Sequence, residues 1–77
     1  MARLTEEEMK KMNEIIRPRF GANLQIIAGS RDENGTYHLA IGDHVRFVSE
    51  AAKQRIAKTL KEEYDDAIYF SGGIRIA

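Results

Sequence analysis

A chain of 77 residues has room for one hydrophobic core and not for two, which predicts a single domain spanning residues 1–77. Hydrophobic residues make up 43% and charged residues 31%, which excludes the composition of a disordered chain. The absence of cysteine excludes disulfides and thiolate metal sites. Twelve basic and twelve acidic residues cancel, so charge-driven binding to nucleic acid or an anionic membrane would require local patches.

The N-terminal segment gives an expectation about the cellular location. Met1-Ala2-Arg3-Leu4 is followed by Thr5 and three glutamates, which is unlike the apolar centre of a signal peptide. No run of the sequence approaches the roughly 20 apolar residues that a membrane-spanning helix needs. We therefore expect a cytoplasmic protein without a membrane partner.

The first predicted element is a helix that begins after Thr5. Thr5 and Glu8 have the spacing of a capping box, in which each side chain accepts a hydrogen bond from the other residue's amide. Pro18 disfavours the α conformation in the residue before it, so we expect the helix to end near Arg17. Apolar residues recur at helical spacing along one face: Met9, Met12 and Ile16.

Two strands and a turn are predicted next. Residues 24–28 are mostly apolar, residues 36–41 alternate between polar and apolar, and Asn34-Gly35 between them is typical of a hairpin turn. Gly42-Asp43-His44 resembles a bend. The residues that follow, 45–48, fit either a third short strand or the tail of the second.

The last part of the sequence predicts a second helix and more strand. Ser49 is a suitable N-cap, and apolar residues then recur at helical spacing as far as Tyr64. Residues 67–70 and 74–76 have strand character. Ser71-Gly72-Gly73 between them fits either a tight turn or a bulge within one long strand.

These elements predict an α+β two-layer sandwich, with two helices packed on one face of a mostly antiparallel sheet of three to five strands. The expected order is α-β-β-(β)-α-β, because both amphipathic helices need an apolar sheet face to cover. The core predicted from this alternation has a sheet side and a helix side. Its members are Leu24, Ile26, Leu39, Ile41, Val45, Phe47, Ile68, Phe70, Ile74 and Ile76 on the sheet, and Met9, Met12, Ile16, Ile56 and Leu60 on the helices.

Four acidic residues cluster around the end of the second predicted helix: Glu62, Glu63, Asp65 and Asp66. Anions are unfavourable there, by roughly a few tenths of a kcal/mol each, because the helix dipole is negative at its C-terminus. A local preference that is broken can indicate a binding site, here an acidic patch for a basic partner. The simpler interpretation is a solvated helix end with the two aspartates in the following loop.

The opposite face of the predicted sheet suggests a second type of partner. Aromatic and guanidinium groups on an open sheet can stack on bases and pair with phosphates. Solvated polar residues on one face of an antiparallel sheet are the simpler explanation. The residues that favour nucleic-acid binding are His38, Arg46, Tyr69 and Arg75, and Gln25, Thr36 and His44 are expected on the same face.

Catalytic and metal-binding patterns are weak in this sequence. His38 and His44 are the only histidines, and together with Asp43 they lack the third ligand in recognisable spacing that a zinc site needs. No serine lies in a strand-turn-helix elbow. Too few residues follow Ser71-Gly72-Gly73 to form the helix of a phosphate-binding loop. We therefore expect no catalytic residues, no metal and no cofactor.

The leading functional hypothesis is a small non-enzymatic protein-binding module, such as an inhibitor or accessory factor. It would bind another protein either through the acidic patch or through a sheet edge extended by a partner strand. The alternative is binding of single-stranded nucleic acid, RNA in particular, to the open sheet face. Homodimerisation through a sheet edge is compatible with both hypotheses and suits a small core.

Overall fold

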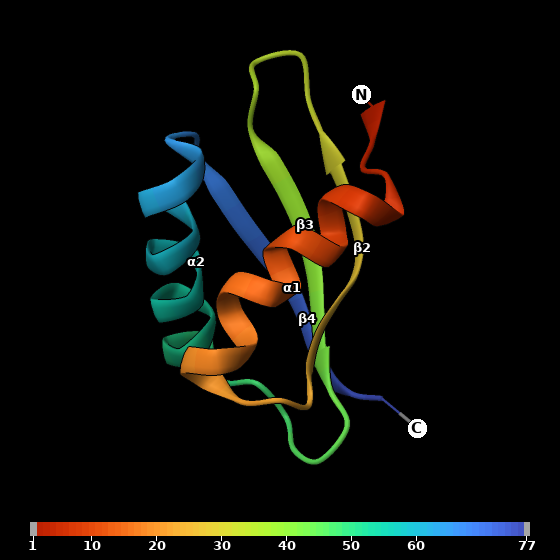
Figure 1. Cartoon of the computed structure of the whole chain (residues 1–77), viewed down its shortest axis with the longest axis vertical. Helices are drawn as coiled ribbons and strands as arrows, with labels where there is room; N and C mark the ends of the chain where they lie inside the picture. The colour runs from red at the N-terminus through yellow and green to blue at the C-terminus, as the bar shows by residue number, and fades with distance from the viewer. Residues whose placement is uncertain (1, 77) are drawn as a thin grey trace.

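The computed structural model describes residues 2–76, which form two helices on one face of a four-stranded sheet (Figure 1). This architecture confirms the predicted α+β two-layer sandwich. The elements in chain order are β1 (Ala2–Arg3), α1 (Glu6–Phe20), β2 (Leu24–Arg31), β3 (Tyr37–Asp43), α2 (Glu50–Tyr64) and β4 (Ile68–Arg75).

The sheet is mixed and has the strand order β1-β2-β3-β4. β2 pairs antiparallel with β1 and with β3, as expected for the hairpin, whereas β4 runs parallel to β3. A parallel neighbour requires a crossover connection, and α2 provides it. The two-residue strand β1, which the sequence analysis did not predict, pairs with Ser30 and Arg31 at the end of β2.

Helix α1 begins as predicted and ends later than predicted. The Thr5 hydroxyl accepts from the Glu8 amide at 3.1 Å, and Glu8 accepts from the Thr5 amide at 3.0 Å, so the capping box is formed. The expected end near Arg17 is wrong, because the helix continues through Pro18 to Phe20. Two bonds hold this last turn: the C-cap Gly21 amide donates to Arg17 O, and the Arg17 Nε atom donates to Leu24 O at 2.7 Å.

The segment between β3 and α2 is a loop, so the expectation of strand at residues 45–48 is wrong. Asp43 is buried, and its Oδ1 atom accepts from the amides of Val45 at 2.7 Å and Arg46 at 3.1 Å. These bonds turn the chain away from the sheet directly after β3. Val45 and Phe47, which were predicted core residues, are consequently 56% and 75% exposed.

The core lies between the sheet and the two helices. Its fully buried centre is formed by six side chains: Met12, Ile16, Leu39, Ile41, Ile56 and Leu60. Tyr37, which the sequence analysis did not place in the core, is also buried. Ile74, which it did place there, is 54% exposed.

Ile74 is exposed because β4 contains a bulge. Ile41 pairs with Gly72 and Gly42 pairs with Ile74, so Gly73 is an extra residue. An extra residue reverses the alternation, which turns Ile74 to the open face. Gly73 has φ +88°, and a Cβ atom on it would lie 2.5 Å from Val48 O, so only glycine fits. Ser71-Gly72-Gly73 is therefore a bulge within one strand.

Candidate functional site

The first part of the outer edge of β4, at Ile68 and Phe70, is available to another chain, whereas farther along Lys53 donates to Gly72 O and the Val48 amide donates to Gly73 O. β4 is the last strand in the sheet order, and no strand within residues 2–76 pairs with its outer side. On the side that faces β3, Ala67 O accepts a hydrogen bond from the Tyr37 amide. On the opposite, outer side, Gly72 O accepts a hydrogen bond from Lys53 Nζ. Because backbone groups of alternate residues point to opposite sides of a strand, those of Ile68 and Phe70 point outward like those of Gly72.

A groove runs along this edge, between β4 and α2. Its volume is about 470 Å³. One wall is the β4 segment Ile68, Tyr69 and Phe70, and the other is a single face of α2. The residues on that face recur at helical spacing: Glu50, Lys53, Gln54, Ala57, Lys58 and Lys61.

The groove is basic. Lys53 is buried, and its Nζ atom lies 2.7 Å from Glu50 Oε1 and 3.2 Å from Gly72 O, so the charges of Lys53 and Glu50 largely cancel. Lys58 and Lys61 are exposed on the same wall, and neither takes part in an ion pair within residues 2–76. A ligand in this groove therefore meets two uncompensated ammonium groups.

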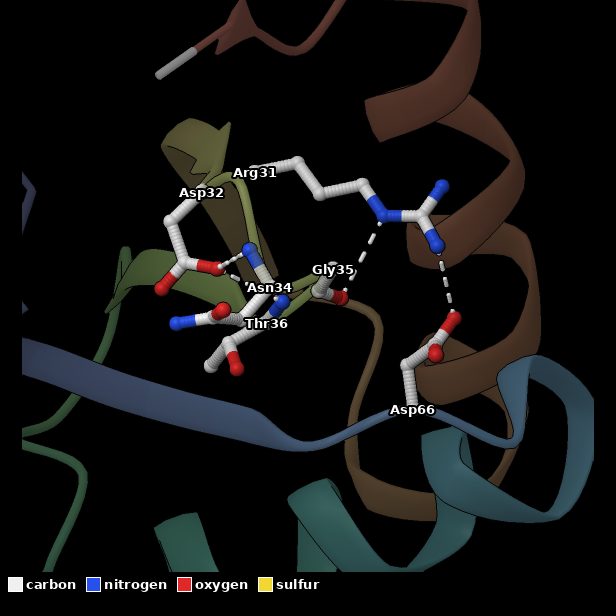
Figure 2. A network of polar contacts seen from close by, with 6 residues as sticks. All are labelled: Arg31, Asp32, Asn34, Gly35, Thr36 and Asp66. Atoms are coloured by element: carbon white, nitrogen blue, oxygen red, sulfur yellow. Dashed lines mark hydrogen bonds and ion pairs between the residues drawn. The ribbon is translucent and has the colours of Figure 1, made fainter.

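The predicted acidic patch lies at the C-terminal end of α2, and two of its members have structural roles. Asp65 is the C-cap in the left-handed conformation, and its amide donates to Lys61 O at 3.2 Å. Asp66 Oδ2 lies 2.9 Å from Arg31 Nη2 of the β2–β3 hairpin. Figure 2 shows this ion pair as a dashed line. Only Glu62 and Glu63 are exposed without such a contact.

The β2–β3 turn beside this ion pair is held by polar contacts. Asp32 Oδ1 accepts from the amides of Asn34 at 2.9 Å and Thr36 at 3.0 Å (Figure 2). His38 Nε2 lies 2.9 Å from Asp32 Oδ2. The hydrogen bond from His38, followed by those from the Thr36 and Asn34 amides, lowers the pKa of Asp32. Asp32 and His38 therefore stabilise the hairpin.

The four residues predicted to bind nucleic acid are only partly brought together. His38 and Tyr69 pair in register on the open face, where their rings stack with centroids 6.0 Å apart. Arg46 lies in the loop after β3. Arg75 pairs in register with the buried Asp43, so it lies on the helix side of the sheet. The open face thus has an exposed aromatic pair without the two predicted arginines.

His44 does not join His38 in a metal site. His44 Nε2 lies 3.2 Å from Gln25 Oε1 near the loop end of β3, whereas His38 lies at the hairpin end. Among residues 2–76 no group of three or more His, Cys, Asp or Glu side chains is arranged to hold a metal ion.

The groove lysines, Lys58 and Lys61, were not among the candidate residues of the sequence analysis. Their spacing from Lys53 and Ala57 already indicated one basic helical stripe. What the sequence did not show is that β4 runs parallel to β3, which brings its edge under this stripe.

No protein-family model, curated protein or solved structure matches this chain. Across residues 2–76, no helix combines the length and apolar character that crossing a bilayer would require.

Proposed function

We propose that the protein is a non-enzymatic binding module that captures an extended segment of another protein by adding it as a strand to β4. The observation that supports this proposal is the unpaired outer edge of β4 beside a groove walled by α2. Main-chain hydrogen bonds to Ile68 and Phe70 would provide affinity, and the groove would select side chains. Such capture suits an inhibitor or an accessory factor.

The chemistry of the groove favours an acidic segment. Alternate side chains of an added strand would enter the groove, where Ala57 and the lysine stems offer apolar contact. Carboxylates there would pair with Lys58 and Lys61. A second copy of this chain is a poorer occupant, because pairing two β4 edges would bring two sets of the same lysines together.

The test compares two synthetic peptides of eight residues, one alternating valine with glutamate and the other valine with lysine. We expect the acidic peptide to bind and to slow hydrogen exchange at the amides of Ile68 and Phe70, measured by NMR. The charge reversal Lys58→Glu with Lys61→Glu should weaken acidic-peptide binding by roughly tenfold and favour the basic peptide.

Lys10→Glu with Lys11→Glu is the matched control, because it makes the same change of net charge on α1, outside the groove. It should leave peptide binding near the parent value. Exchange at Ile68 and Phe70 that neither peptide slows would contradict strand addition. Equal effects of the two double variants would show that only net charge matters.

The exposed pair of His38 and Tyr69 supports a second candidate function, binding of single-stranded RNA to the open face. Tyr69 is 63% exposed and is stacked with His38. Base stacking on an aromatic side chain contributes about 1–3 kcal/mol per base. Tyr69→Ala should then reduce affinity for a single-stranded oligonucleotide at low salt, whereas oligonucleotide binding unaffected by this change would contradict the candidate.

A further inference from the structure

Three segments distant in the sequence meet at one end of the molecule, the lower end in Figure 1. The His44 amide donates to Asn23 O at 3.2 Å, the Val48 amide to Gly73 O at 2.9 Å, and the Ile76 amide to Asp43 O at 2.9 Å. We call this region, formed by residues 17–24, 42–50 and 73–76, the basic end.

Most of the exposed large apolar side chains gather there. Of the five among the described residues, four lie at the basic end or against it: Ile27 at 42%, Val45 at 56%, Phe47 at 75% and Ile74 at 54% exposed. Ile27 belongs to this group because its Cδ1 atom covers Gly42. Val45 and Phe47 lie in the loop after β3, beyond the sheet. Single exposed apolar residues are ordinary, but a group at one end indicates an interaction site.

Arginines accompany these apolar groups. Arg19, Arg46 and Arg75 of the basic end are exposed. Arg46 and a fourth exposed arginine, Arg55, line a hollow of about 260 Å³ together with Phe47. The remaining lining of that hollow is largely apolar, with Phe20, Leu24, Val48, Ala52 and Ile56.

Acidic residues at the basic end do little to offset this charge. Asp43 is buried and accepts two loop amides, and Glu50 pairs with Lys53. Most of the other acids lie at the opposite end of a molecule 33 Å long: Glu6, Glu7, Glu8, Asp32, Glu33, Glu62, Glu63, Asp65 and Asp66. The Debye length in physiological salt is about 8 Å, so those acids scarcely weaken the field at the basic end.

From this combination we infer that the basic end docks on the surface of an anionic phospholipid bilayer. Arginines would meet the lipid phosphates while Val45 and Phe47 enter the boundary between headgroups and acyl chains. Nucleic acid would use the arginines but would gain little from the aliphatic side chains of Ile27, Val45 and Ile74. The sequence analysis expected no membrane partner, but it left room for local charged patches, and the net charge of zero does not reveal this one because it averages over both ends.

The sequence contains no tryptophan, so Phe47→Trp introduces a single fluorescent reporter into the loop. We expect its emission to shift to the blue on vesicles of 70% phosphatidylcholine and 30% phosphatidylserine, and to be quenched when brominated lipids are included. Vesicles of pure phosphatidylcholine should give no shift. Tyr69→Trp is the control, because it places the reporter at an exposed position away from the basic end, where no shift is expected.

Sedimentation with the same vesicles measures the contributions of charge and insertion. Arg46→Gln should lower the partition coefficient by about fivefold. Val45→Ser with Phe47→Ser should lower it by roughly tenfold or more, whereas Lys58→Gln in the α2–β4 groove should change it less than twofold. Circular dichroism of each variant verifies that the fold is retained.

Three outcomes would overturn the inference. The first is unchanged emission of the Phe47→Trp variant on phosphatidylserine vesicles. The second is vesicle binding that survives the double serine change, since charge alone would then explain it. The third is binding of a single-stranded oligonucleotide that depends on Arg46 and Phe47 while vesicles do not bind, which would assign the basic end to nucleic acid.

Discussion

Asn13 is a polar residue buried within α1, and its role depends on an irregularity in the sheet. Its Oδ1 atom accepts from the Ile26 amide at 2.8 Å. The register between β2 and β3 shifts directly after Ile26, so Ile27 is an extra residue there. The Asn13 side chain thus accepts the hydrogen bond of a backbone amide beside the β2 bulge, and this bond connects α1 to β2.

Replacing Asn13 by alanine should therefore reduce the free energy of unfolding by about 1–3 kcal/mol, because the Ile26 amide would remain buried without a partner. Urea denaturation followed by circular dichroism measures the change. The neighbouring exposed residue provides the control: Glu14→Ala should alter stability by less than about 0.5 kcal/mol. Similar stabilities for the two variants would contradict this role of Asn13.

Glu8 makes the stability of the fold depend on pH. Hydrogen bonds from the Thr5 amide and then the Thr5 hydroxyl lower the pKa of Glu8 below its ordinary value of 4.5. The folded protein then binds this proton less readily than the unfolded chain. The contribution of Glu8 is accordingly complete above pH 4.5 and is lost as the pH falls through the lowered pKa.

We therefore expect the parent and the Glu8→Gln variant to differ most at neutral pH and to converge as the pH falls below 4.5 and through the lowered pKa of Glu8. Urea unfolding at several pH values measures the difference. Asp32, whose pKa is also lowered, contributes to the acid lability of both proteins, so the difference between them isolates Glu8. Parallel pH curves would contradict the capping role of the carboxylate.

At the scale of elements, local patterns in the sequence were sufficient to predict the two helix starts and the hairpin turn. The Thr5 capping box, the second helix from Ser49 and the Asn34-Gly35 turn depend on residues within a few positions of one another, and each formed as predicted. The orientation of β4 and the bulge at Gly73 depend on partners far away in the sequence. Strict alternation therefore placed Ile74 on the wrong face.

The β4 bulge predicts a large effect of one methyl group. Gly73→Ala should reduce the free energy of unfolding by roughly 2–4 kcal/mol, because φ +88° is unfavourable for alanine and the new Cβ would lie 2.5 Å from Val48 O. Gly21→Ala is a matched control, since φ is also positive there but no atom lies within 4 Å of the added Cβ. Thermal unfolding should rank Gly73→Ala clearly below Gly21→Ala, and the reverse order would contradict the steric argument.

At the scale of the whole molecule, composition concealed the distribution of charge. The twelve acids and twelve bases cancel in the sequence, but the fold places most of the acids at the end with the β2–β3 hairpin and most of the exposed arginines at the other end. The groove likewise forms only when α2 crosses over and brings Lys58 beside β4. Neither the groove nor the basic end could be predicted from the sequence, because each is formed by segments that are far apart in the chain and come together only in the folded sheet and its helices.

Charge separation can be tested without changing the net charge. Arg46→Glu combined with Glu62→Arg preserves the formal net charge but weakens the separation, so this variant should elute earlier than the parent from a cation exchanger at pH 7. Lys61→Glu combined with Glu62→Lys exchanges two neighbouring charges in the last turn of α2 and should elute with the parent. Identical elution of all three proteins would show that the exchanger does not sense a separated charge.

The β3–α2 loop is fixed at both ends, and this has a thermodynamic consequence. Asp43 Oδ1 accepts from the amides of Val45 and Arg46. At the other end of the loop, Gly73 O accepts from the Val48 amide and Gly72 O accepts from Lys53 Nζ. A loop already ordered in this way loses little conformational entropy when a surface covers Phe47. The heat capacity change of docking should thus reflect the apolar area of a few side chains, without the larger change that accompanies coupled folding.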